Sequence, residues 1–415
     1  MSHQQQTISP FASVQINEYR NLMIGRFLFV AGLRMIGTLC GWWIYNLTND
    51  PFAIGLIGLA EVIPAVSLAL YAGHVIDISE KRKLILRGVM LYCLASVILF
   101  ALSFSQSKGY LASHSTAIFI YAVIFCTGII RAFTGPVFAT LVGSIVPKEL
   151  LQNATSWNQG IWLAASVSGH AACGLLIAAI GNTATLGVIV SLIIISFFIL
   201  ATIKKRPAIA AVKEKPTLES VREGLRFVFK TKEVLGALSL DMFAVLFGGA
   251  VAMIPVFARD ILKIGPQGFG WLNAATDLGS ICMVIILTVF PMRRHHGKKL
   301  LLAVAGFGIC IIIFALSKNF VLSFMALMIS GMLDGVSVVV RGTILQLKTP
   351  PEMRGRVLSV NSMFINSSNE LGQFESGIAA KALGVIPSVV FGGCMTILVV
   401  IITSVKAPSL KEMEY

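Results

Sequence analysis

Two long apolar runs of the chain are joined by the stretch Gly73-His74-Val75-Ile76-Asp77-Ile78-Ser79-Glu80-Lys81-Arg82-Lys83-Leu84. A Gly permits close helix approach, and an Asp can cap the start of a neighbouring helix. Three consecutive cations favour the cytoplasmic side of a membrane. The stretch therefore predicts a tight cytoplasmic turn between two membrane-spanning helices.

The composition of the whole chain agrees with a membrane location. Of the 415 residues, 56% are hydrophobic and only 13% are charged, and the mean hydropathy is +0.85. A soluble domain needs more charge to cover its surface, so this composition excludes a soluble globular protein. The seven cysteines stand in apolar runs without a CxxC pair, and they predict neither a disulfide framework nor a metal site. We expect an all-α polytopic protein embedded in a lipid bilayer.

Apolar segments of roughly 20 residues, the length that crosses a hydrocarbon core as a helix, recur along the chain. We predict about twelve spans, at 22–46, 52–73, 84–106, 116–144, 154–180, 184–203, 236–258, 268–291, 299–316, 320–346, 357–380 and 383–405. Short polar turns join most of them, at Asn49-Asp50-Pro51, Gly181-Asn182-Thr183, Lys318-Asn319 and Gly384.

Only one connection between spans is long. It is rich in Lys and Arg, and it carries apolar residues at helical spacing, namely Leu218, Val221, Leu225 and Phe229. This pattern predicts an amphipathic helix at the membrane surface. We therefore divide the chain into a six-helix bundle at 1–203, a cytoplasmic linker at 204–235 and a second six-helix bundle at 236–415.

The positions of the cations predict the orientation. Of the 33 Lys and Arg residues, roughly 25 fall in the termini and in the loops after even-numbered spans, against about five on the other side. Both termini are therefore expected in the cytoplasm. The same asymmetry accounts for the net charge of +14 without a nucleic-acid partner.

A short motif recurs at an offset of about 203 residues, which indicates two repeated halves. Its first copy follows the fourth predicted span and its second copy follows the tenth, pairing Pro147, Glu149, Ser156 and Asn158 with Pro350, Glu352, Ser359 and Asn361. The same shift relates Arg131 to Asp334.

The basic turn resembles the loop between helices two and three of the major facilitator superfamily, whose usual form is Gly-x-x-x-Asp-Arg-x-x-Arg-Arg. Gly73, Asp77, Lys81 and Arg82 match that form, whereas Ile78 replaces its first Arg. The resemblance implies a gating role for this loop and the fold of the superfamily, twelve transmembrane helices in two pseudo-symmetric six-helix bundles.

Further segments resemble the drug and siderophore export branch, which contains enterobactin and macrolide exporters. They include Gly55 to Pro64, Arg131 to Leu150, Gly224 to Val228, Ile254 to Ala258, Met353 to Val357 and Ser368 to Gly372. One departure is His170, which stands where proton-driven exporters of the superfamily usually carry Pro. The resemblance implies a monomer in a bacterial inner membrane, with no cofactor.

Ionisable residues inside the spans are the candidates for the functional site, because each is costly to bury unless it is paired or hydrated. By resemblance, helices one, four, seven and ten line a central cavity, which selects Arg34, Arg131, Asp241 and Asp334 as coupling or cavity residues. We expect Arg131 and Asp334 to meet across the pseudo-twofold axis, either as a proton-coupling pair or as a permanent bridge.

Other intramembrane charges are secondary candidates: Glu61, His170, Asp277 and Glu370. Residues near span ends are expected to direct their charges to the membrane interface, namely Arg26, Asp260 and Lys381. No spacing of His, Cys and carboxylates predicts a metal site.

A secondary transporter is the function class that these features favour. The sequence has no Walker-type loop for ATP, so a proton gradient is the expected energy source. The resemblance to the efflux branch implies export of a siderophore-like or drug-like amphipathic small molecule. Movement of lysophospholipid or another lipid, and uptake of an organic solute, remain alternatives. A membrane enzyme would need a clustered acid–base or metal constellation, which the sequence does not show, so we expect no enzymatic activity.

Overall fold

The computed structural model describes residues 9–135, 137–206, 217–290, 292, 295–350 and 353–411. Over these residues the chain is helical, with short turns and without strands, which confirms the all-α prediction. The surroundings of some helical residues are not described, among them those of Gly73 and Asp77.

The first half of the chain forms a bundle in which α1 packs along α6, while α2 and α3 both contact α4. A single turn of 3₁₀ helix at Lys148–Leu150 precedes α6. The helices of this half are α1 (Asn17–Thr48), α2 (Pro51–Ile78), α3 (Lys81–Ser107), α4 (Ser113–Thr134), α5 (Val137–Ile145) and α6 (Leu151–Ala201).

The second half forms a bundle in which α12 packs against α10 and α11, and α14 packs against α11 and α8. Its long helices are α8 (Lys232–Phe247), α10 (Gly265–Val289), α11 (His296–Leu316), α12 (Phe320–Lys348), α13 (Arg354–Leu383) and α14 (Val385–Lys406). Short helical turns continue α8 toward α10, as η2 (Ala250–Met253), α9 (Ile254–Val256) and η3 (Phe257–Ile261), and α15 (Pro408–Lys411) follows α14.

The helices account for the twelve predicted spans. Ten runs of the described residues are long and apolar enough to cross a membrane. One of them, Lys148–Ala201, holds two spans, because Gly181 takes φ 76° and breaks the helix. The remaining span is α13, whose 30 residues include the polar side chains Asn361, Asn369, Glu370, Gln373 and Glu375 and are therefore less hydropathic.

The sequence explains where several helices begin and end. Asn49 takes the left-handed conformation after α1, and the Asp50 side chain then accepts a hydrogen bond from the backbone N–H of Phe52 at 3.0 Å to cap α2. Asn319 caps α12 in the same way, through Val321 and Leu322. The turn predicted at 73–84 is shorter than expected, because α2 continues to Ile78 and leaves only Ser79 and Glu80 before α3.

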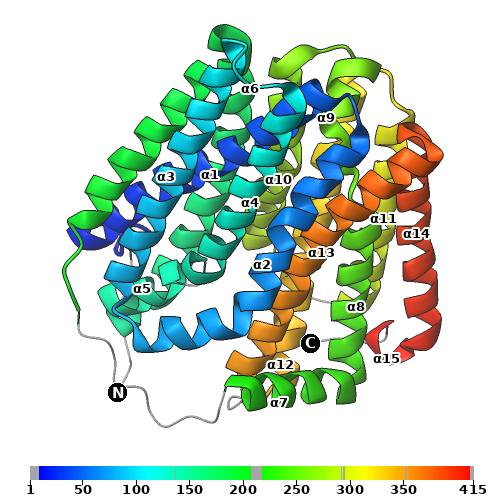
Figure 1. Ribbon diagram of the computed structural model, residues 1–415. Helices are drawn as coiled ribbons and strands as arrows, with labels where there is room; N and C mark the ends of the chain where they lie inside the picture. The colour runs from blue at the N-terminus through cyan, green and yellow to red at the C-terminus, as the bar shows by residue number, and fades with distance from the viewer. Residues whose placement is uncertain are drawn as a thin grey trace, which may run out of the picture.

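The start of α1 and the helix α15 lie at one end of the bundle, which we name the terminal end. The opposite end, which holds the turns at residues 49–50, 181 and 384, is named the far end (Figure 1). The two halves meet mainly where α2 packs against α13 and where α6 packs against α10. At these crossings backbones touch through glycines: a Cβ at residue 55 would lie 2.9 Å from the Cα of Gly377, and one at residue 174 would lie 2.7 Å from the Cα of Gly270. The glycines therefore allow the halves to pack closely toward the far end.

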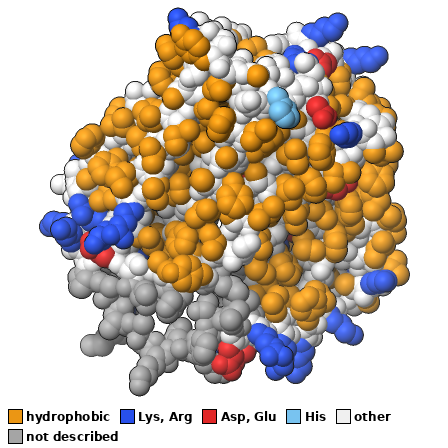
Figure 2. All heavy atoms as spheres, viewed as in Figure 1, with side chains coloured by type: hydrophobic (Ala, Val, Ile, Leu, Met, Phe, Trp, Pro, Cys, Tyr) orange, Lys and Arg blue, Asp and Glu red, His pale blue; other side chains and the backbone are white. Residues whose placement is uncertain are grey.

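The outer surface suits a lipid environment. Large hydrophobic side chains are exposed on most helices, for example Leu94, Ile195, Ile285, Leu302 and Ile401. Figure 2 shows hydrophobic side chains over the middle of the visible face and Lys and Arg mainly near its margins.

The long connection contains the amphipathic helix α7 (Thr217–Lys230), which lies across the terminal end (Figure 1). It packs on α13: a Cβ at Gly224 would lie 3.0 Å from the carbonyl oxygen of Arg356, and the Arg356 guanidinium pairs with Glu223. Val228 of α7 is fully buried, in a cluster with Val357 and Val360 of α13. The side chains of Leu218 and Val221 lie outside the described residues, and the domain limits at 203 and 235 stay a prediction.

Candidate functional site

Two glycines bring helices α2, α4 and α13 together near the middle of the bundle. A Cβ at Gly128 of α4 would lie 2.6 Å from the backbone oxygen of Glu61, so only a glycine allows α2 to lie this close. On the opposite side of α2, a Cβ at Gly58 would lie 2.4 Å from the backbone oxygen of Glu370. The three helices therefore converge on one point, although α13 belongs to the other half of the chain.

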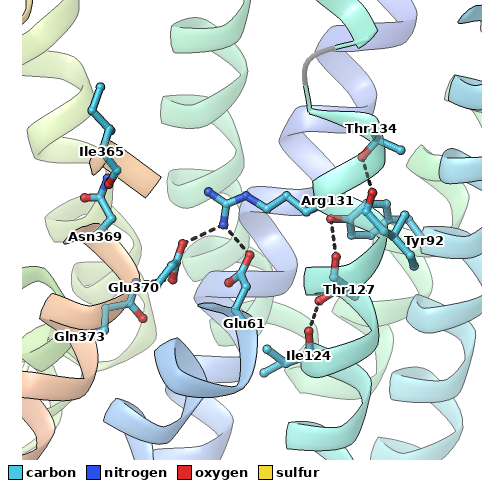
Figure 3. A network of polar contacts seen from close by, with 11 residues as sticks. Glu61, Tyr92, Ile124, Thr127, Arg131, Thr134, Ile365, Asn369, Glu370 and Gln373 are labelled. Atoms are coloured by element: carbon cyan, nitrogen blue, oxygen red, sulfur yellow. Dashed lines mark hydrogen bonds and ion pairs between the residues drawn. The ribbon is translucent and has the colours of Figure 1, made fainter. Parts of the chain in front are cut away.

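Three ionisable side chains meet at this convergence. Nη1 of Arg131 donates to Oε1 of Glu61 at 2.5 Å and to Oε1 of Glu370 at 2.7 Å (Figure 3). With both carboxylates ionised, these side chains carry a net charge of minus one, because one guanidinium serves two acids. We name these residues the central triad.

The triad is partly hydrated and partly enclosed. The side chain of Arg131 is 38% exposed and that of Glu61 is 23% exposed, whereas that of Glu370 is only 8% exposed. Buried charge is costly unless it is paired or hydrated, so Glu370, the acid with least access to water, depends most on its ion pair with Arg131.

Neighbouring polar groups order the helices around the triad (Figure 3). The Tyr92 hydroxyl of α3 donates to the Thr127 carbonyl oxygen at 3.2 Å, one turn before Arg131 on α4. Gln373 reaches the second oxygen of Glu370 at 3.4 Å from its own helix. The second terminal nitrogen of the Arg131 guanidinium points away from both acids (Figure 3).

A second polar cluster joins α1, α6 and α10 across the two halves. The Thr38 hydroxyl and Nδ1 of His170 lie 2.6 Å apart, and Nε2 of His170 lies 3.6 Å from Oδ2 of Asp277. The Ser166 hydroxyl donates to the same Asp277 oxygen at 2.5 Å. His170 is thus hydrogen-bonded to α1 and lies close to Asp277 of α10, at the position where the family resemblance expected Pro.

Arg34 and Asp334 lack ion-pair partners among the described residues. The guanidinium carbon of Arg34 lies 4.8 Å from the centre of the Trp162 ring. Asp334 lines a small pocket inside the second half, together with Asp241 and Phe307. The prediction that Arg131 pairs with Asp334 is therefore wrong: Arg131 reaches Glu61 and Glu370 instead.

Asp241 forms an ion pair that is buried inside the second half. Its carboxylate binds the guanidinium of Arg341 and accepts from the Ser337 hydroxyl at 3.4 Å. The side chains of Arg341 and Asp241 are only 5% and 8% exposed. This enclosed pair links α8 to α12 rather than one half to the other.

The predicted gating loop is described only in part. Lys81 donates to the Ile76 carbonyl oxygen at the end of α2, and Arg82 donates to the Ala201 carbonyl oxygen at 2.6 Å. These contacts tie the turn to the ends of α2 and α6, and the gating role stays a prediction. The contacts of Gly73 and Asp77 are not among those that the structure describes.

A network at the far end closes the two halves against each other. Arg259 of η3 donates to the side chains of Asn46 at 3.1 Å and Asn49 at 2.7 Å, and its guanidinium lies 4.2 Å from the centre of the Tyr45 ring. The Tyr45 hydroxyl also bonds Asp260. The sequence analysis missed this network, although an Arg-Asp pair directly after an apolar run was a signal for it.

Comparison with known proteins supplies the family. The family model described as "Transmembrane secretion effector" matches residues 8–415. The multidrug efflux pump Tap of Mycolicibacterium fortuitum is 22% identical over 386 residues, which cover 90% of this chain and 91% of that protein. The enterobactin exporter EntS of Escherichia coli O1:K1 is 24% identical over 342 residues, 82% of this chain and 79% of that protein.

Solved structures show the same fold at low sequence identity. A mutant of the nucleoside transporter NupG superposes with a TM-score of 0.74 at 12% identity, covering 94% of this chain and 99% of that one. The D-xylose-proton symporter superposes with a TM-score of 0.73 at 12% identity, covering 97% and 100%. The chain belongs to the transmembrane secretion effector family of the major facilitator superfamily, in agreement with the resemblance to its efflux branch.

Proposed function

We propose that this multi-pass membrane protein is a proton-driven exporter of an amphipathic organic small molecule. The central triad is the observation that carries the proposal, because Glu370 comes from one half and its partners Arg131 and Glu61 come from the other. The efflux pumps among its relatives support outward transport.

The protonation state of the triad can control how tightly the two halves of the chain are held together. An ionised Glu370 holds α13 against α4 through Arg131, whereas a protonated Glu370 loses most of that attraction and favours separation. The arrangement described here has Glu370 bonded to Arg131 and the far end closed. It fits the proton-free state of an antiporter that awaits its solute from the terminal end.

The distribution of the cations supports the proposed orientation. We place the terminal end in the cytoplasm of a bacterial cell, since the Lys- and Arg-rich loops and α7 lie there. Solute then enters from the cytoplasm, and a monomer suffices because all members of the triad come from one chain. Transport rather than catalysis is the proposed activity.

A secretion assay tests the proposal. Spent medium is compared by untargeted mass spectrometry, under iron-replete and iron-limited growth, among cells lacking the protein, cells restored with it and cells restored with Glu370→Gln. We expect an organic solute that disappears without the protein and returns only with the unmutated form. The matched control is Glu375→Gln, which removes a carboxylate from α13 outside the triad. Identical media from all strains would contradict export.

A further inference from the structure

Arg34 is an intramembrane cation that forms no ion pair with any residue that the structure describes. It lies 17 residues into α1, near the middle of that helix, and is half-buried. Among the described residues its guanidinium makes neither an ion pair nor a hydrogen bond. An arginine at this depth is costly unless an anion or water accompanies it, so the position indicates a partner that the chain itself does not provide.

The surroundings hold this cation in a fixed place. A Cβ at Gly169 would lie 2.9 Å from Cβ of Arg34, so α6 presses directly on the base of the side chain. Trp162, two turns earlier on α6, presents its ring 4.8 Å from the guanidinium carbon. Phe27 and Trp162 pack on a small apolar cluster beside it. The result is a positioned guanidinium bordered by an aromatic wall.

The nearby acids are already engaged by other groups. Glu61 and Glu370 share Arg131, and Asp277 accepts from Ser166 and faces His170. In the second half, Asp241 is enclosed with Arg341. Asp334 forms no ion pair with Arg34 or with any other cation among the described residues. Arg34 acts on Glu370 only from a distance, without a hydrogen bond, so its N–H donors are left for a solute.

A second cation lies on the same helix toward the terminal end. Arg26 precedes Arg34 by eight residues, about 12 Å along a helix. Its guanidinium bonds Asn158 of α6 and lies 5.5 Å from the centre of the Phe138 ring. Two arginines with aromatic neighbours thus follow the α1–α6 contact inward from the terminal end, from which we propose that solute enters.

We propose that Arg34 and Trp162 form the part of the solute site that binds an organic anion with an aromatic body. The planar guanidinium can donate two parallel hydrogen bonds to a carboxylate, sulfonate or phosphate group, and the indole ring can stack on an aromatic ring. The inference rests on the proposed transport function and specifies its substrate class.

Three probes with the same dansyl ring system test the charge preference: dansylglycine is anionic, dansylglycinamide is neutral and dansylethylenediamine is cationic. The full-length protein in lipid nanodiscs binds each probe in equilibrium dialysis, and empty nanodiscs correct for partition into lipid. We expect at least tenfold tighter binding of the anionic probe than of the neutral one, and weakest binding of the cation.

Variants assign that preference to the site. Arg34→Gln should reduce the difference between the anionic and neutral probes to less than twofold, and Arg34→Lys should keep part of it. Trp162→Leu should weaken the anionic and neutral probes alike, whereas Trp162→Phe should keep most of the binding. Arg20→Gln is the matched control, since Arg20 is an exposed arginine on α1 whose side chain, among the described residues, bonds Asn17 alone.

The result that overturns the proposal is a lack of preference for the anionic probe in the unmutated protein, or an equal loss of all three probes in Arg34→Gln at unchanged thermal stability. Binding in nanodiscs needs no proton gradient. Absence of an anion preference would therefore leave the proposal of proton-driven export intact. If the anion preference is present but the secretion assay shows no export, only the proposed transport function is contradicted.

Discussion

Glu370 of α13 accepts a hydrogen bond from Arg131 of α4 at 2.7 Å and thereby joins the second half of the chain to the first. Glu61 accepts a hydrogen bond from the same guanidinium nitrogen at 2.5 Å. The two acids compete for one donor, and a proton on either of them removes the excess negative charge.

Glu370→Gln should separate solute exchange from proton-driven transport. The amide keeps the size of the side chain but cannot alternate between an ion pair and a proton, so we expect gradient-driven transport to fall at least tenfold while exchange of solute across the membrane without a gradient persists. Proteoliposomes loaded with the solute found in the secretion assay provide both measurements. Equal loss of both rates in a folded protein would show that Glu370 binds the solute rather than the proton.

Arg131→Gln should destabilise the protein by about 3–5 kcal/mol, because it leaves two carboxylates facing each other without a cation. Adding Glu61→Gln should recover part of that loss, since one charge is then removed. Thermal unfolding of the purified single and double variants in detergent forms a double-mutant cycle. Additive effects of the two substitutions would mean that Arg131 and Glu61 are not energetically coupled.

Asp241→Asn should act on stability rather than on coupling. Its pair with Arg341 is enclosed within the second half, so removing the acid leaves a buried guanidinium uncompensated, at a cost of about 3–5 kcal/mol. The transport that remains, normalised to folded protein, should keep its dependence on the proton gradient. A stable variant that exchanges solute but no longer responds to the gradient would instead make Asp241 a coupling acid.

The sequence allowed the helices to be predicted more completely than their contacts. Spans follow from runs of apolar residues, and even the polar α13 was placed at 357–380, close to its observed bounds. Glu61, Arg131 and Glu370 were each recognisable as intramembrane charges. Their meeting was not predictable, because it depends on the close crossings at Gly58 and Gly128, which no spacing along one helix reveals.

The incorrect pairing of Arg131 with Asp334 has a related cause. A repeat relates two positions in the two halves, but side-chain partners depend on which helices lie between them. Here Arg131 reaches α2 and α13, whereas Asp334 faces a pocket within its own half. Arg259 was missed because a cation at the end of a span usually indicates contact with the membrane interface, and its bonds to Asn46 and Asn49 arise only in the folded protein.

Arg259→Ala should loosen the far end. Several exposed hydrogen bonds and a cation–π contact are lost together, each contributing up to about 1 kcal/mol. We expect severalfold faster hydrogen–deuterium exchange in peptides covering residues 43–50 and 257–262, measured by mass spectrometry. Lys318→Ala is the matched control, because Lys318 is an exposed cation at the same end, between α11 and α12. Equal exchange in both variants would show that Arg259 does not hold the halves together.

Gly174→Ala should impair the closed far end through backbone contact alone. A Cβ at this position would lie 2.4 Å from the backbone oxygen of Pro266, and backbone cannot yield as a flexible side chain can, so α6 and α10 must separate. We expect at least tenfold slower transport together with faster hydrogen exchange at the start of α10. Gly160→Ala controls for the change in helix propensity, since it lies on the same helix with no atom within 4 Å of its added Cβ. Normal transport by Gly174→Ala would mean that α6 and α10 need not pack this closely during the cycle, and the proposed closing of the far end would have to rely on the Arg259 contacts and on the crossing of Gly55 with Gly377.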